Sequence, residues 1–194
     1  MLRQREKKRI SLGQGVELDV ETILFIALGA TAAYWAESMC DANAACRNYA
    51  QNKPFKDFSS FYPFYLTQHL DQTCRRLHFV GTSIVILILA MDLSIAVAMV
   101  AGGLWGLATF SVTRSRETGT LEGFVTLGIF LLTYRRLTKN ITKAALVLFV
   151  GYGFAWIGHF FFENNRPATF IYPVFSLASD FKLWYEIASR QRAF

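Results

Sequence analysis

The sequence predicts an all-α, polytopic membrane protein with four transmembrane helices and one further hydrophobic helix near the N-terminus. Of its 194 residues, 53% are hydrophobic and 18 are phenylalanine. Charged residues make up 18%, below the roughly 25% that is usual in soluble domains. The net charge of +6 comes from basic residues that flank apolar runs. Such flanks are typical of topology signals and lipid-headgroup contacts, so we expect a membrane environment and no nucleic-acid partner.

The first 57 residues combine a basic start, one apolar run and a polar loop. Residues 1–15 form a polar tail that we expect to lie near anionic lipid, and they lack the apolar core and cleavage site of a signal peptide. Its basic residues are Arg3, Arg5, Lys7, Lys8 and Arg9. The apolar run 22–36 is slightly short for a span, which indicates a tilted or interfacial helix or a contact with another subunit. We expect residues 37–57 to form a loop. Cys40 and Cys46 in this loop can form a disulfide bridge only if the loop faces an oxidising compartment.

Residues 58–65, FSSFYPFY, form an aromatic cluster interrupted by Pro63, which suits the headgroup region of a membrane. Four apolar segments follow, at about 77–91, 93–110, 119–134 and 144–162. Asp92 separates the first two with almost no loop, so we expect them to form a helical hairpin. Basic pairs precede the first segment and follow the second, which places both ends on the positive, cytoplasmic side.

Segment 119–134 is the weakest of the four. About 15 helical residues reach only roughly 23 Å, whereas the hydrocarbon core is about 30 Å thick. The basic stretch YRRLTKNITK follows it, and this flank by itself favours a re-entrant or interfacial helix. If the segment does cross, Asn140 of the sequon Asn-Ile-Thr lies on the far side, in a loop too short for efficient glycosylation.

Histidines mark the candidate functional centre. His69 and His78 lie in one polar patch, and His159 lies in another with Glu163 four residues later. A spacing of four places His159 and Glu163 on one helix face, and polar groups at a membrane edge need partners. The two patches meet only if an even number of crossings separates them, so the site requires segment 119–134 to cross. Cys74, between the first two histidines, is either a soft metal ligand or a small interfacial residue.

Simpler interpretations of these residues remain open. An isolated His-x-x-x-Glu is usually a hydrogen-bonded pair on a helix surface. His69 could merely anchor the chain at the interface, and His78 could bond a backbone carbonyl.

Two long blocks resemble the membrane family of fungal 2-hydroxy fatty acid dioxygenases and their bacterial relatives. They are FSSFYPFYLTQHLDQTCRRLHFVGTS and GYGFAWIGHFFFENNRPATFIYPVFSLASDF, within about 58–90 and 147–184. The fungal enzyme is an iron(II)-dependent protein of the endoplasmic reticulum that removes one carbon from 2-hydroxy fatty acids during phytosphingosine breakdown. The resemblance implies a lipid or fatty acyl substrate and Fe(II), or another divalent metal. It also implies a ligand set, namely His69, His78, His159 and Glu163.

The chemistry of three further polar residues suggests roles for them at such a site. Arg76 or Arg166 would pair with the substrate carboxylate, and Asn165 would orient a ligand or contact the substrate. The competing interpretation makes Arg76 a topology anchor and Arg166 the residue that holds the turn before Pro167.

The chain departs from a compact member of the family in two regions. Residues 1–57 form an N-terminal extension, and about 92–143 form an extra hairpin within a membrane domain at 58–184, which a tail at 185–194 follows. Such additions suit a subunit recruited into a larger assembly. The leading expectation is an iron-dependent dioxygenase. The alternatives are an accessory subunit of a respiratory or photosynthetic complex, in an organellar inner membrane, and a lipid-binding membrane protein without catalysis.

Overall fold

The computed structural model describes residues 9–12 and 15–194, and this part of the chain is nearly all α-helical, as the sequence predicted. The helices are α1 (Val20–Ala42), α2 (Phe58–Thr67), α3 (Gln72–Met91), α4 (Leu93–Thr113), α5 (Thr120–Thr138), α6 (Thr142–Ile157) and α7 (Pro173–Ala188). Helix α6 continues into a π-helical turn, η1 (Gly158–Glu163), and a 3₁₀ turn, η2 (Ala168–Phe170), precedes α7.

The basic tail predicted for residues 1–15 falls mostly outside the described residues, including Arg3, Arg5, Lys7 and Lys8. Its end is more ordered than expected. Strand β1 (Arg9–Ser11) pairs antiparallel with β2 (Glu17–Asp19), and Arg9 lies opposite Asp19. This small hairpin leads directly into α1.

Aspartates define where four helices begin. Each carboxylate accepts a hydrogen bond from a backbone N–H in the first turn of the helix that follows, which satisfies a group that has no partner within the helix. The caps are Asp19 for α1, Asp57 for α2, Asp71 for α3 and Asp92 for α4. Asp92 also ends α3, so one residue separates two long helices.

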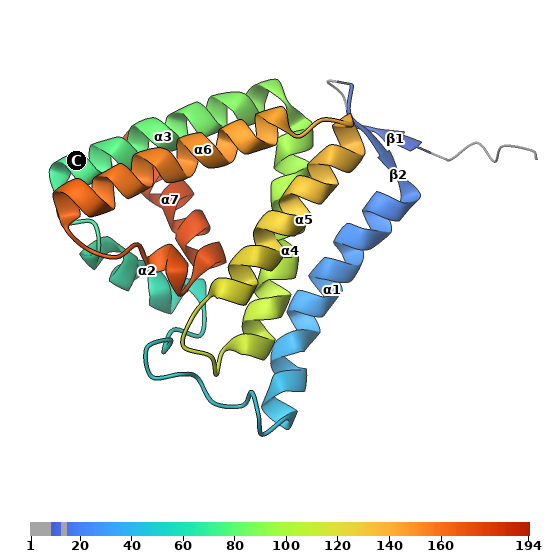
Figure 1. The fold of residues 1–194 in the computed structure, drawn as a ribbon, viewed down its shortest axis with the longest axis horizontal. Coiled ribbons are helices and arrows are strands. Elements are labelled where there is room, and N and C mark those ends of the chain that lie inside the picture. Colours follow the sequence, from blue (N-terminus) through green and yellow to red (C-terminus); the bar gives the residue numbers. More distant parts are fainter. Residues whose placement is uncertain (1–8, 13–14) are drawn as a thin grey trace, which may run out of the picture.

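The helices form two groups that diverge from the bend at Asp92 (Figure 1). Helices α3 and α6 lie side by side and antiparallel, whereas α4 packs between α5 and α1. The side-by-side hairpin expected for 77–91 and 93–110 therefore does not form. A single connecting residue is too short to turn one helix back along the other, so α3 and α4 open away from the bend. As a result, the start of α3 lies beside the end of α6.

Four helices are long and apolar enough to cross a membrane, as predicted, but their identities differ from the expectation. They are α1, α3, α4 and the continuous segment Thr142–Glu163. The apolar run at 22–36 extends to 23 helical residues, because the helix includes flanking residues on both sides. Helix α5, which contains segment 119–134, is not among the four and carries Glu122, Arg135 and Arg136. It still runs back along α4 for its full length, which returns the chain to the bend where α6 begins.

The aromatic cluster at 58–65 contributes to the protein core. Phe61, Tyr62 and Tyr65 are buried and pack against aromatic residues of α4 and α7. Helix α2 continues through Pro63, and its i, i+4 spacing brings Phe61 and Tyr65 to one face. Tyr65 is thereby placed next to the histidine patch.

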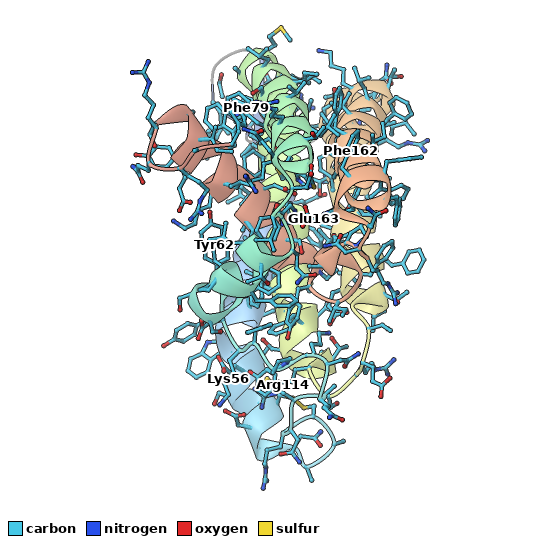
Figure 2. All side chains as sticks on the ribbon, turned by 90° about the vertical axis from the view of Figure 1, so that its left-hand side faces the viewer. Lys56, Tyr62, Phe79, Arg114, Phe162 and Glu163 are labelled. Carbon is cyan, nitrogen blue, oxygen red and sulfur yellow. A yellow bond between two sulfur atoms is a disulfide. The ribbon has the colours of Figure 1, made fainter. Side chains whose placement is uncertain are left out.

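Helix α1 docks on α4 through a close approach at Gly29. A Cβ atom at this position would lie 2.8 Å from Nε1 of Trp105, which donates a hydrogen bond of 3.3 Å to the carbonyl of Phe25. Cys40, in the last turn of α1, is joined to Cys46 by a disulfide with a Cα–Cα distance of 5.4 Å, so the bridge that the sequence left open is present. The loop that follows reaches the end of α4 (Figure 2), where the buried Arg114 pairs with Asp41.

An ion-paired carboxylate near the end of α7 fixes the C-terminus. Glu186 accepts hydrogen bonds from Tyr62 (2.8 Å) and Arg192 (2.8 Å), and it pairs with Lys182 (2.9 Å). Burial raises its pKa, but these donors outweigh that effect and lower the pKa to about 2 from an ordinary 4.5. Glu186 is therefore ionised at neutral pH and connects α2, α7 and the tail.

Candidate metal centre

Three histidines from two distant stretches of the chain meet at one point. His69 lies in the short loop between α2 and α3, His78 lies in the second turn of α3, and His159 lies in η1. The ring centroid of His69 lies 4.6 Å from the ring centroid of His78 and 4.6 Å from that of His159. The ring centroids of His78 and His159 are 5.1 Å apart. All three side chains are buried. The antiparallel pairing of α3 and α6 produces this convergence.

Each imidazole has an oxygen acceptor at its Nδ1 atom. That acceptor is the carbonyl of Tyr65 for His69 (2.7 Å), the carboxylate of Asp180 for His78 (2.6 Å) and the amide oxygen of Asn165 for His159 (2.7 Å). The carbonyl and the carboxylate can only accept, so His69 and His78 must donate from Nδ1.

The amide of Asn165 is oriented as well, because its nitrogen donates to the carbonyl of Gln68 at 3.0 Å. Its oxygen therefore faces His159, which must also donate from Nδ1. In the neutral form of each ring, the Nε2 lone pair is therefore left for a ligand.

The remaining nitrogen atoms fit a metal ion. The Nε2 atoms of His69 and His78 are buried and have no hydrogen-bond partner, which is costly unless something else binds them. One ligand atom from each of the three histidines and the sulfur of Cys74 lie within 4.8 Å of one another. Burial and the two neighbouring histidines hold the pKa of His69 well below its usual value, so its ring is neutral. Neutral imidazoles with fixed tautomers are the usual donors to zinc and iron.

Asp180, on α7, is the main polar residue of this centre that was not singled out in the sequence. Its Oδ1 atom accepts hydrogen bonds from His78 and from the hydroxyl of Tyr65, whose ring stacks on His69 with a centroid distance of 4.0 Å. Burial opposes ionisation, but His78 and Tyr65 hold the pKa of Asp180 below its ordinary value. A single carboxylate among the small and apolar residues of SLASDF is the signal that could have identified it.

Glu163 lies next to the cluster of donor atoms but does not belong to it. Its two oxygens accept hydrogen bonds from the backbone N–H groups of Leu70 (2.8 Å) and Asp71 (2.7 Å). Figure 2 shows Glu163 near the middle of the molecule, where η1 approaches the start of α3. Because the carboxylate is occupied by these donors, it holds the His69 loop against η1.

Cys74 occupies the fourth position of the cluster. Cys74 lies in the first turn of α3, and its side chain is fully buried against η1. A Cβ atom at Gly158 of η1 would lie 2.9 Å from the sulfur of Cys74. The absence of a side chain at residue 158 thus makes room for this sulfur beside the three histidines. Both interpretations that the sequence allowed for Cys74, a metal ligand or a small packed residue, are compatible with this position.

The two arginines expected to hold a substrate carboxylate lie elsewhere. The guanidinium of Arg76 is over the ring of Phe194 at 5.8 Å, and that of Arg166 is over the ring of Phe170 at 5.0 Å. Neither arginine is among the described residues that line the cavity beside the histidines. Asn165 contacts His159, as expected of a residue that orients a ligand.

The comparison with protein families matches most of the chain. Residues 55–114 and 119–192 match the model of the family described as 2-hydroxy-palmitic acid dioxygenase Mpo1-like. A search of curated proteins and a search of solved structures each gave no match. The match includes most of the stretch at 92–143 that the sequence suggested was additional, and it begins after residue 54. On the strength of this match, the chain belongs to the 2-hydroxy-palmitic acid dioxygenase Mpo1-like family.

Proposed function

We propose that this protein is an iron(II)-dependent dioxygenase that shortens 2-hydroxy fatty acids by one carbon. The observation that carries the proposal is the convergence of three buried histidines whose Nδ1 atoms all donate to protein oxygens. Histidine ligands with open positions suit non-haem iron and oxygen chemistry. The membership in the family supports the reaction and the substrate class.

In this proposal His69, His78 and His159 hold the metal through Nε2, and Cys74 lies within reach as a fourth donor. Bound iron(II) would supply the activation of O₂. Asp180 and Asn165 keep His78 and His159 in the correct tautomer and orientation. We assign Glu163 a positioning role in place of direct ligation, because both of its oxygens accept from the backbone.

The surroundings of the centre favour an acyl substrate. A cavity of about 120 Å³ begins at His78, His159 and Asp180, and most of its other lining residues are apolar. An apolar cavity of this kind excludes water from the reacting end of a ligand. Since Arg76 and Arg166 lie away from it, we propose that the carboxylate and the 2-hydroxyl of the substrate bind at the metal end.

The test is to purify the full chain, measure its bound metal and assay the conversion of 2-hydroxypalmitate to the acid one carbon shorter. Stoichiometric iron and formation of this product are expected for the unaltered protein. His159→Ala should lose both, because it removes one of three ligands. Arg166→Ala is the matched control, since its side chain lies over Phe170 outside the cavity. Iron-loaded protein without this product would refute the proposed reaction.

A structural role in a larger membrane complex is the second candidate. It is favoured by the N-terminal unit, because residues 1–54 lie outside the family match and α1 exposes Leu28 and Trp35 on the side away from α4. Metal-free protein that co-purifies stoichiometrically with a large complex would support this role over catalysis. Protein that binds acyl chains without metal or product would instead indicate a lipid-binding protein.

A further inference from the structure

The disulfide at the end of α1 carries information about the compartment that this part of the chain faces. Cys40 and Cys46 are bonded to each other, and both side chains are buried. Disulfides form and persist in oxidising environments, such as the lumen of the endoplasmic reticulum or the bacterial periplasm, and they are rare where thiols are kept reduced. The bond thus indicates that the end of α1 lies towards an oxidising compartment. We call this end of the molecule the disulfide face.

The histidine cluster lies on the disulfide face, because no span separates it from the bond. Helices α1 and α3 are both long and apolar enough to cross a membrane. Between the end of α1 at Ala42 and the start of α3 at Gln72, the structure contains one helix, α2. The 10 residues of α2 reach roughly 15 Å, which is about half the thickness of the hydrocarbon core. His69 directly follows α2, so the chain reaches it without a crossing.

Contacts at the two ends of α1 agree with this arrangement. On the disulfide face, Arg114 at the end of α4 donates a hydrogen bond of 2.8 Å to the carbonyl of Cys46. At the opposite end, Arg136 in the last turn of α5 pairs with Asp19 at the start of α1, at 2.9 Å. Helices α1 and α4 therefore run in the same direction, and α5 returns to the bend between α3 and α4 (Figure 1). We call this opposite end the bend face.

Exposed positive charge is placed as expected for a bend face on the cytoplasmic or equivalent reducing side. The last turn of α5 and the turn after it expose Arg135 and Lys139, and loops on that side of a membrane carry an excess of such residues. The basic pairs that suggested the opposite orientation in the sequence serve the fold instead. Arg75 donates to the carbonyl of His69 at 2.7 Å, and Arg114 is buried.

We infer that the histidine cluster faces the oxidising compartment beside its membrane, whereas the bend at Asp92 and the α5–α6 turn face the reducing side. The metal and the polar end of a substrate are therefore taken up from the oxidising side. The sequon at Asn140 lies on the reducing side, out of reach of glycosylation. The inference goes beyond the proposed function and does not depend on it, because a loop lies on the same face with or without iron or product.

The experiment places the full chain in the inner membrane of a bacterial host, where stable disulfides form on the periplasmic side. Three variants each add one cysteine at an exposed position. They are Gln51→Cys near the disulfide, Leu70→Cys beside the histidines and Asn140→Cys in the α5–α6 turn. Spheroplasts are treated with a charged maleimide that does not cross lipid. Mass spectrometry then gives the labelled fraction of each peptide before and after lysis.

Gln51→Cys and Leu70→Cys should be labelled in intact spheroplasts as fully as after lysis, whereas Asn140→Cys should be labelled only after lysis. The unaltered protein gives the background, since its three cysteines are bonded or buried. In the unaltered protein, the disulfide should be present in this host and lost in a strain that lacks the periplasmic thiol oxidase. Alkylation of thiols at lysis preserves this difference for measurement.

Labelling of Leu70→Cys only after lysis would overturn the inference, whichever way the other two variants react. Labelling of Asn140→Cys in intact spheroplasts would also overturn it, as would a disulfide that forms without the periplasmic oxidase. The melting temperature in detergent shows whether each variant folds. If Leu70→Cys does not fold, Thr67→Cys replaces it, and Glu117→Cys replaces Gln51→Cys in the same way. Both alternative positions are exposed and lie on the disulfide face.

Discussion

Asp180 provides the sharpest test of the metal centre, because it contacts a candidate ligand without being one. Its carboxylate accepts a 2.6 Å hydrogen bond from Nδ1 of His78. Asp180→Asn keeps the size of the side chain, removes its charge and allows the amide nitrogen to face His78. The change should leave the fold intact and weaken the hold on this imidazole.

Two estimates of the magnitude agree. A hydrogen bond to a charged group contributes about 1.5–3 kcal/mol. Loss of an outer partner of a metal-binding histidine typically costs 10- to 100-fold in metal affinity, or about 1.4–2.7 kcal/mol. We therefore expect Asp180→Asn to bind metal about 10- to 100-fold more weakly. The assay is a titration with Co(II) or anaerobic Fe(II) in competition with a chelator.

Glu186→Gln is the matched control for this prediction. Glu186 lies on the same helix and also accepts a hydrogen bond from a tyrosine hydroxyl, that of Tyr62, but it does not contact the histidines. The Glu186→Gln variant should therefore bind metal with the same affinity as the unaltered protein. Metal affinity that is the same in Asp180→Asn as in the unaltered protein, or reduced equally in both variants, would refute the role assigned to Asp180.

Three further predictions concern stability, and each is checked by the melting temperature in detergent. Glu163→Gln should destabilise the fold by about 1–2 kcal/mol, since one neutral amide oxygen replaces two carboxylate acceptors; normal stability would contradict its positioning role. Gly106→Ala should cost about 1–3 kcal/mol, because its Cβ would lie 2.1 Å from Oγ1 of Thr126, whereas Gly103→Ala, with open space, should not destabilise. The pKa of Glu186 is lowered to about 2, so its stabilisation is present above its ordinary pKa of 4.5 and is lost as the pH falls towards 2. Roughly 1–2 kcal/mol should disappear over that range in the unaltered protein, with a smaller loss in Glu186→Gln.

Parts of the site could be predicted because they depend on local chemistry. Histidines beside apolar segments have few stable roles without a partner, so His69, His78 and His159 were recognisable as a group. The i, i+4 spacing of His159 and Glu163 predicted that both point at one ligand, but Glu163 is not part of the cluster of donor atoms. The spacing did not reveal that the backbone N–H groups of Leu70 and Asp71 occupy the carboxylate. A backbone donor is present at every residue, and no sequence pattern marks the ones that will face a given side chain.

Asp180 was missed for a related reason. It is more than 100 residues from His78, and the two meet only because α7 packs against α3. The substrate role expected for Arg76 and Arg166 stays a prediction. Their charge suggested a substrate carboxylate, but aromatic rings at Phe194 and Phe170 receive them instead. Contacts of this kind depend on the folded path of the chain after η1.

The sequence by itself determined the helical class, the apolar segments, the helix break at Asp92 and the three histidines, because hydrophobic run length, capping and the cost of buried polar groups are local properties. Only the tertiary structure decided that α3 pairs with α6 instead of α4, that Asp180 and Asn165 fix the imidazole tautomers, and that a largely apolar cavity adjoins His78 and His159. These features depend on which helix faces pack together. That choice is made by the shape and burial of the whole chain, and no single segment encodes it.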